Sequence, residues 1–219
     1  MKKFLIGAVA AAGLALASQA NAAQVIYNLT LSGCSSSCGA GPYGTVTVTD
    51  FGNDSLSYVV QLLNGAQFNV SGNSSTHESF DFDLVGSPTI TYSNVTSGFV
   101  DAGGISDASP FGAFTYSLNL TTPTHNPSNV SKLEFTVTAL TALSVNSVGS
   151  TTNSNNSNQQ LAFVADVSSN GNTGNVAALA GGTPGGVPEP ATWAMMLVGF
   201  GGMGALLRHR RRQGRAAIA

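Results

Sequence analysis

Strict alternation of apolar and polar side chains is clearest in the stretch Lys132-Leu133-Glu134-Phe135-Thr136-Val137-Thr138-Ala139. Because successive side chains of a β-strand point to opposite faces, this period of two predicts a strand with one buried and one exposed face. The more continuous apolar run over residues 56–63 predicts a strand that is covered on both faces. Shorter alternating stretches occupy residues 25–31, 45–49, 80–84, 114–120 and 161–165.

Turn-forming residues separate these stretches. Residues 23–187, which we call the body, nowhere repeat apolar residues at the helical period. About eight to ten short strands in a body of this size are typical of an all-β domain. We therefore predict an antiparallel, jelly-roll-like β-sandwich over residues 23–167. Because residues 168–187 are rich in glycine and small polar side chains, we expect a flexible linker there.

Charge is distributed unevenly along the 219 residues. Residues 23–187 contain nine acidic side chains but a single basic one, Lys132, and all other Lys and Arg residues lie near the two ends. A nucleic-acid-binding protein needs basic side chains to neutralise phosphates, and a nucleotide enzyme needs a cationic clamp. This composition excludes nucleic acid as an expected partner.

The N-terminus has the three parts of a secretory signal peptide. Lys2 and Lys3 supply positive charge, residues 4–17 are apolar, and Ala20-Asn21-Ala22 provides small residues at a cleavage position. We therefore predict a signal helix over residues 1–22, which signal peptidase removes, and export of the remaining chain.

The C-terminus contains a second apolar segment, residues 191–207, which is followed by a cluster of arginines. Its length is close to the minimum for a helix that crosses a bilayer. Trp193 at one end and the arginines at the other fit the aromatic belt and the positive-inside rule. We expect a transmembrane helix that holds the precursor in the inner membrane, with the body outside the cytoplasm.

Ahead of the apolar segment and the arginines stands Pro188-Glu189-Pro190-Ala191-Thr192-Trp193-Ala194, which has the form P-E-P-x-x-W-A. This order of motifs resembles the PEP-CTERM sorting domain, which we assign to residues 188–219. The resemblance implies processing by an exosortase, a membrane-embedded cysteine transpeptidase or protease of Gram-negative bacteria that make exopolysaccharide or a biofilm matrix. It further implies cleavage near the motif and a final location at the cell surface or outside the cell. Such tails are also catalogued as an ice-binding-protein C-terminal domain. The residues that carry the resemblance are Pro188, Glu189, Pro190, Trp193, Ala194, Arg208, Arg210, Arg211 and Arg212.

Cys34 and Cys38 are the two cysteines of the chain. An exported protein meets an oxidising compartment, so we predict a disulfide between them. A zinc site would need a second pair of ligands at suitable spacing, which the sequence lacks. We predict neither a metal nor a cofactor.

The densest polar cluster of the body is His77-Glu78-Ser79-Phe80-Asp81-Phe82-Asp83. On a strand, His77, Asp81 and Asp83 share one face, which we interpret as a solvated face. The competing interpretations are a site for a hard cation and a carboxylate pair that hydrolyses a glycan. The segment Gly104-Ile105-Ser106-Asp107-Ala108 is similar to a nucleophile elbow but lacks the final glycine, and we assign it no role.

Three hypotheses follow for the body. The first is a non-enzymatic surface or matrix protein in contact with exopolysaccharide. The second is a module that binds a glycan or ice, for which the threonine row Thr45, Thr47 and Thr49 is one candidate surface, although exposed threonines are common in strands. The third is a glycan-active hydrolase that uses the carboxylates near His77. We favour the first and predict no catalytic residue.

Overall fold

The computed structural model describes residues 22–69, 78–121, 129–185 and 200. All of these except Phe200 belong to one compact unit, Ala22–Gly186. Apart from Ala22 and Phe200, the predicted signal peptide and the predicted transmembrane helix lie outside the described residues. Within the described ranges, no helix has the length and apolar character that crossing a membrane requires.

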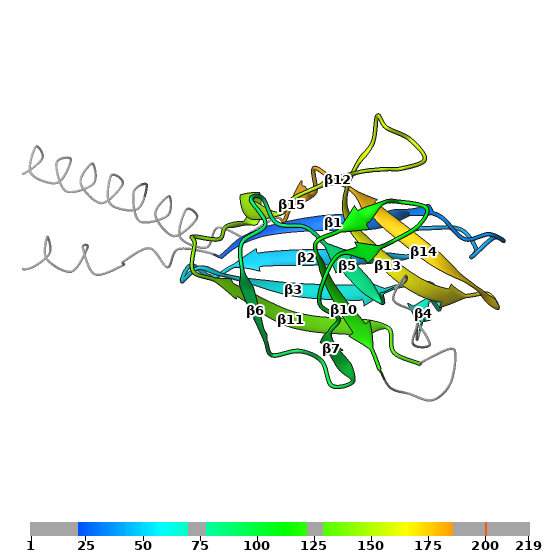
Figure 1. Ribbon diagram of the computed structural model, residues 1–219, viewed down its shortest axis with the longest axis horizontal. Coiled ribbons are helices and arrows are strands. Elements are labelled where there is room, and N and C mark those ends of the chain that lie inside the picture. The colour runs from blue at the N-terminus through cyan, green and yellow to red at the C-terminus, as the bar shows by residue number, and fades with distance from the viewer. Residues whose placement is uncertain (1–21, 70–77, 122–128, 186–199, 201–219) are drawn as a thin grey trace, which may run out of the picture. The chain divides into compact units, whose positions relative to one another are not determined.

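The described unit consists of antiparallel strands, which confirms the prediction of an all-β fold (Figure 1). One short 3-10 helix, η1 (Val145–Ser147), interrupts them. The strands are β1 (Ala23–Ser32), β2 (Gly44–Asp50), β3 (Ser55–Leu62), β4 (Gln67–Phe68), β5 (Phe80–Phe82), β6 (Ile90–Ser93), β7 (Phe99–Asp101), β8 (Ser106–Asp107), β9 (Ala113–Phe114), β10 (Tyr116–Leu120), β11 (Lys132–Ala139), β12 (Thr151–Thr152), β13 (Gln160–Ser169), β14 (Asn172–Leu179) and β15 (Thr183–Pro184).

Thirteen of the strands form one sheet in the order β6-β11-β3-β2-β1-β14-β13-β5-β10-β7. The short strands β12 and β4 pair with β13, and β15 pairs with β1. Strands β8 and β9 form a separate two-stranded sheet. The predicted sandwich would have two separate main sheets. Here β1 is hydrogen-bonded to β2 on one side and to β14 on the other, so both halves belong to one continuous sheet.

Aromatic side chains show that the two halves of this sheet face each other. The ring of Tyr58 on β3 stacks on that of Phe135 on β11 at 4.7 Å, and it also contacts Phe82 on β5 at 5.3 Å between ring centres. Phe163 on β13 packs edge-on against Tyr58 at 6.2 Å. The main core therefore lies between β3 and β11 on one side and β5 and β13 on the other.

Burial follows the predicted alternation in β11, where every second side chain is buried. The prediction that residues 56–63 are covered on both faces is wrong, because β3 alternates buried with half-buried residues. Strand β13 is covered on both faces, as is the short strand β5. The second face of β13 lies in a smaller core whose buried members are Ala108, Phe111, Phe114, Leu161, Val164 and Ala177.

A register shift between Leu161 and Phe163 lets β13 contribute side chains to both cores. Phe163 points into the main core, whereas Leu161, two positions earlier, belongs to the smaller one. Without a bulge, residues two apart on a strand would share a face. A similar irregularity between Leu29 and Leu31 of β1 places Leu29 in the main core and Leu31 against the smaller core.

The linker predicted over residues 168–187 is wrong, since the sheet continues through most of it. Strand β13 runs to Ser169, and β14 and β15 follow. Asn170 and Gly171 form the two-residue turn between β13 and β14, with φ values of 51° and 77°. Positive φ at both positions is what a tight type I′ hairpin requires, and Asn-Gly is its preferred sequence. The glycines that suggested flexibility therefore serve hairpin geometry and close packing.

Candidate functional site

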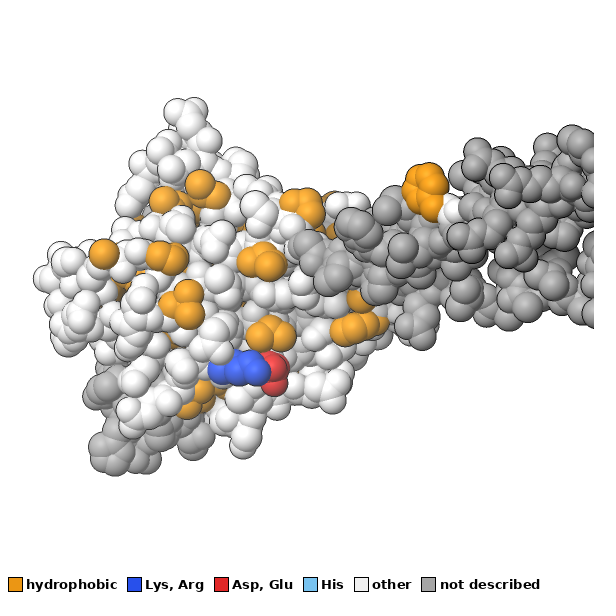
Figure 2. All heavy atoms as spheres, turned by 180° about the vertical axis from the view of Figure 1, so that it is seen from behind, with side chains coloured by type: hydrophobic (Ala, Val, Ile, Leu, Met, Phe, Trp, Pro, Cys, Tyr) orange, Lys and Arg blue, Asp and Glu red, His pale blue; other side chains and the backbone are white. Residues whose placement is uncertain are grey.

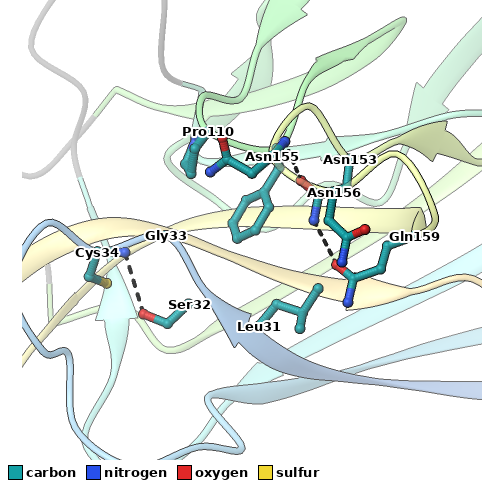
Figure 3. A pocket seen from close by; sticks show the side chains of 10 residues that line it. Leu31, Ser32, Gly33, Cys34, Pro110, Asn153, Asn155, Asn156 and Gln159 are labelled. Atoms are coloured by element: carbon teal, nitrogen blue, oxygen red, sulfur yellow. Dashed lines mark hydrogen bonds between the residues drawn. The ribbon is translucent and has the colours of Figure 1, made fainter.

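An open groove of about 530 Å³ lies at the surface of the smaller core (Figure 3). Three segments far apart in the sequence form it: the end of β1 with the cysteine loop, the turn before β9, and the loop between β12 and β13. Its lining residues are Leu31, Ser32, Gly33, Cys34, Pro110, Phe111, Asn153, Asn155, Asn156 and Gln159.

The amide-bearing wall of the groove is fixed by hydrogen bonds inside its own loop. The Nδ2 of Asn153 donates to Oε1 of Gln159 at 2.8 Å, and the backbone N–H of Asn155 donates to Oδ1 of Asn153 at 2.9 Å. Asn153 is only 4% exposed, and its backbone N–H donates to the carbonyl of Gln159. The side chains of Asn155 and Asn156 are exposed on this prearranged loop.

The opposite wall depends on a close approach at Gly33. A Cβ atom there would lie 2.5 Å from Cδ of Pro110, so only glycine allows these two segments to meet. The N–H of Gly33 donates to the carbonyl of Asn175 at 2.8 Å, and Nδ2 of Asn175 donates to the carbonyl of Ser109 at 2.8 Å. Strand β14 thus holds both segments in place.

The predicted disulfide between Cys34 and Cys38 is confirmed, with a sulfur–sulfur distance of 2.03 Å. The loop that it closes is fastened to the turn between β13 and β14. Nδ2 of Asn172 donates to the carbonyl of Ser37 at 2.9 Å, and Nδ2 of Asn170 donates to the carbonyl of Cys38 at 3.3 Å. The cysteine loop is therefore attached at several points beside the groove.

Asp81, which we placed on a solvated strand face, is completely buried. Its neighbours across the sheet are Val164 on β13 and Ser117 on β10, and Val164 belongs to the smaller core that β8 and β9 help to build. The prediction of a solvated face fails at this residue because that second layer covers β5. Alternation predicts that Asp81 and Phe82 lie on opposite faces, but it does not predict that both faces are buried.

The surroundings of Asp81 disfavour its ionised form. Burial raises the pKa of this carboxyl well above its ordinary value, and the negative charges of Glu78, Asp166 and Asp83 act in the same direction. The hydroxyl of Ser106 lies beside the carboxyl and offsets part of that rise, without a hydrogen bond of normal geometry. Asp81 is therefore a buried acid whose surroundings favour the protonated form.

The structure thus brings together Asp81 and Ser106, two residues that the sequence singled out separately. Ser106 lies in β8 and is 3% exposed, and neither its hydroxyl nor that of Ser117 has a hydrogen-bond partner among the described residues. Such a closed position does not present a nucleophile to a substrate, in contrast to an elbow at the top of a sheet.

The other members of the predicted polar cluster do not join Asp81 on a common face open to solvent. His77 lies outside the described residues. Asp83 is half-buried, and its Oδ1 accepts a hydrogen bond from the backbone N–H of Thr115 at 2.8 Å. Among the residues that the structure describes, no three His, Cys, Asp or Glu side chains converge on a position that could hold a metal ion.

The threonine row lies on the outer face of β2, where Thr45, Thr47 and Thr49 are half-exposed. Thr47 pairs with Ile26 on one side and with Val59 on the other, so apolar side chains interrupt the hydroxyl surface. Figure 2 shows a face with scattered apolar side chains and one basic side chain beside an acidic one. In the described part of the chain, the basic side chain is Lys132, whose Nζ lies 2.6 Å from Oε1 of Glu134.

Comparison with known proteins bears on the C-terminus. Residues 186–212 match the family model described as the PEP-CTERM protein-sorting motif. The match contains every residue from Pro188 to Arg212 that we assigned to the sorting signal, although these positions lie outside the described residues. No curated protein and no solved structure matches the chain significantly. The chain is thus an exported protein with a PEP-CTERM sorting motif, the signal on which an exosortase acts.

Proposed function

We propose that this chain is a non-enzymatic surface or matrix protein whose β domain remains outside the inner membrane after an exosortase has processed its tail. The observation that carries the proposal is the position of the sorting motif. The motif begins at residue 186, directly after the last described residue of the sheet region, Gly185. The product that functions outside the cell is the folded β domain, in contact with the surrounding exopolysaccharide.

The end of the β domain supports this division of the chain. Pro184 and Thr183 of β15 pair with Val25 and Ile26 of β1. Because residues up to Gly185 are held along β1, a cut within the motif would remove the tail and leave the sheet intact.

The buried position of Asp81 supports a non-enzymatic role. A glycan hydrolase needs two carboxyl groups on either side of the scissile bond, and both must reach the substrate. Asp81 is completely buried, and Asp83 is bound to the backbone of Thr115. The hydrolase alternative therefore loses the residue on which it chiefly rested.

The experiment that tests sorting replaces Pro188, Glu189 and Pro190 together with alanine. We expect the variant to accumulate as the unprocessed precursor in the membrane fraction, whereas the unaltered chain yields a shorter product at the surface or in the medium. Thr192→Ala is the matched control, because Thr192 occupies a variable position of the motif. Normal processing of the triple variant, measured by immunoblot and intact mass, would overturn the proposal.

A glycan-binding role is the second candidate, and the amide-lined groove favours it. The groove also favours a glycan over ice, because a concave site suits a single chain molecule whereas an ice surface requires a flat regular array. The threonine row with its apolar neighbours lacks this regularity.

A further inference from the structure

We propose that the groove lined by Asn153, Asn155, Asn156 and Gln159 binds a short, uncharged oligosaccharide. This inference concerns the β domain itself and does not depend on how the tail is sorted. It follows from four properties of the groove: its charge, its amides, its apolar side chains and its rigidity.

The lining of the groove excludes a charged ligand. Among the lining residues, Cys34 alone is of a type that can ionise, and it is held in a disulfide. A phosphate or carboxylate ligand would meet no cation there, and a metal ion would meet no carboxylate. The body carries nine acidic residues and one basic residue, so its overall field repels polyanions. The expected ligand is therefore neutral.

The amide wall suits a ligand that is covered with hydroxyl groups. A carboxamide both donates and accepts hydrogen bonds, and so does each sugar hydroxyl. The side chain of Asn155 is exposed and makes no hydrogen bond with a described residue. The Oδ1 of Asn156 accepts from the backbone N–H of Asn158 at 3.2 Å, which directs this side chain while its Nδ2 stays free to donate. The side chains of Asn155 and Asn156 thus leave hydrogen-bond donors and acceptors available to a ligand at the surface.

Apolar side chains complete the lining of the groove. Leu31, Pro110 and Phe111 are among its lining residues, and Phe111, which is 4% exposed, is anchored in the smaller core. A sugar ring has an apolar C–H face and a rim of hydroxyls, so a site that combines apolar side chains with amides matches both parts. An apolar lining with a few placed polar groups is the usual form of a small-ligand site.

The groove is also held rigid before any ligand binds. Asn153 and Gln159 bond to each other, and the disulfide loop is fastened to β14. A site that is already ordered loses little conformational entropy on binding. Its volume of about 530 Å³ lies within the usual range for small-ligand sites, and its open form accommodates a stretch of a longer chain.

The test measures binding of the full-length chain in detergent to defined sugars by isothermal titration calorimetry. The neutral probes are maltohexaose, cellohexaose and mannohexaose, and the acidic probe is hexagalacturonate. We expect at least one neutral probe to bind, and the acidic probe to bind at least about tenfold more weakly. Because the precursor itself is used, failure of sorting would leave this result unchanged, and failure of binding would leave sorting unchanged.

Variants assign the binding to the groove. The double variant Asn155→Ala, Asn156→Ala should weaken binding at least about tenfold with little change in the melting temperature, because the hydrogen bond that Asn156 accepts from Asn158 is exposed to solvent. Asn158→Ala is the matched control, because Asn158 is an exposed amide of the same loop that does not line the groove. Asn156→Asp keeps the side-chain shape and replaces the amide donor with a negative charge, and should weaken binding similarly. The proposal is overturned if no neutral probe binds, or if the groove variants bind as tightly as Asn158→Ala.

Discussion

The backbone N–H of Gly185 donates a hydrogen bond to the carbonyl oxygen of Gln24 over 2.8 Å, which joins the end of the described chain to the start of its first strand. A Cβ at Gly185 would lie 2.6 Å from Oε1 of Gln24, the flexible end of a side chain that can move aside. A Cβ at Gly182 would lie 2.8 Å from the carbonyl oxygen of Ile26. The segment that precedes the sorting motif is therefore part of the sheet and is held against β1.

The first prediction concerns Gly182→Ala. The added methyl group would meet Val25 Cγ1 at 2.7 Å and Tyr27 Cδ1 at 2.8 Å as well as the backbone of Ile26, so β15 must move away from β1. We expect a loss of about 1–3 kcal/mol in the free energy of unfolding, as is typical of overpacked sites. Hydrogen exchange at the amide of Gly185 should accelerate, because its bond to Gln24 depends on this docking.

Gly41→Ala provides the control for that substitution. A Cβ at Gly41 would meet its nearest atom, in the ring of Tyr43, at 3.4 Å, an ordinary contact distance. In Gly41→Ala, hydrogen exchange at the amide of Gly185 should be as slow as in the unaltered chain. If Gly182→Ala leaves both stability and exchange at Gly185 unchanged, the docking of β15 on β1 is wrong.

The second prediction concerns Asp81→Asn and the pH dependence of stability. The folded state raises the pKa of Asp81 above its ordinary value of 3.8, so between these two pKa values the folded chain binds more protons than the unfolded chain. The free energy of unfolding therefore falls as the pH rises from about 4 toward the raised pKa. Asparagine has nearly the same shape and removes this titration.

We expect Asp81→Asn to be more stable than the unaltered chain by about 1–3 kcal/mol at pH 7.5, because the cost of keeping the buried carboxyl neutral is gone. The advantage should shrink toward zero near pH 4, where the unfolded chain also protonates Asp81. Urea titrations at the two pH values measure both quantities. An advantage of equal size at both would show that Asp81 does not hold a proton in the fold.

The third prediction compares two buried tyrosines. The hydroxyl of Tyr58 has no hydrogen-bond partner among the described residues, whereas that of Tyr43 donates to the carbonyl of Gly39 at 2.8 Å. An unpaired buried hydroxyl costs about 1–3 kcal/mol, and a hydrogen bond of this kind contributes about 1 kcal/mol. Tyr58→Phe should therefore raise the free energy of unfolding, and Tyr43→Phe should lower it.

Denaturant unfolding of both variants under one set of conditions measures these opposite signs. Each change removes one oxygen atom from a buried ring, so the two variants control for each other. A loss of stability in Tyr58→Phe that is as large as in Tyr43→Phe would mean that the hydroxyl of Tyr58 has a partner after all.

Local sequence patterns were sufficient for the class of fold but not for its layers. The alternation at residues 132–139 predicts the observed burial of β11 because one face of that strand is buried and the other is largely exposed. Burial on both faces, as in β13, depends on β8 and β9, which are too short to show a pattern. The hairpin at Asn170 and Gly171 could have been predicted from its Asn-Gly pair, but the surrounding glycines and small polar residues masked that signal.

The candidate site was only partly predictable for the same reason. The disulfide follows from two cysteines in an exported chain, and the structure confirms it. The groove was missed, since it combines three segments that are distant in sequence, and none of Asn153, Asn155 or Gln159 carries a local motif. The burial of Asp81 was missed because its neighbours in space, Ser106 and Val164, come from separate parts of the chain.

The central position of β1 makes closure of the sheet depend on the last long strand of the domain. Strands β1 to β3 pair with their sequence neighbours and can form early. The other edge of β1 is completed by β14, with Leu31 opposite Ala177, so it stays open until nearly the whole domain is available to fold. A chain that stops short of β14 would expose that edge to strand addition by other molecules. In the complete domain, β14 covers this edge of β1 just before the sorting motif in the sequence.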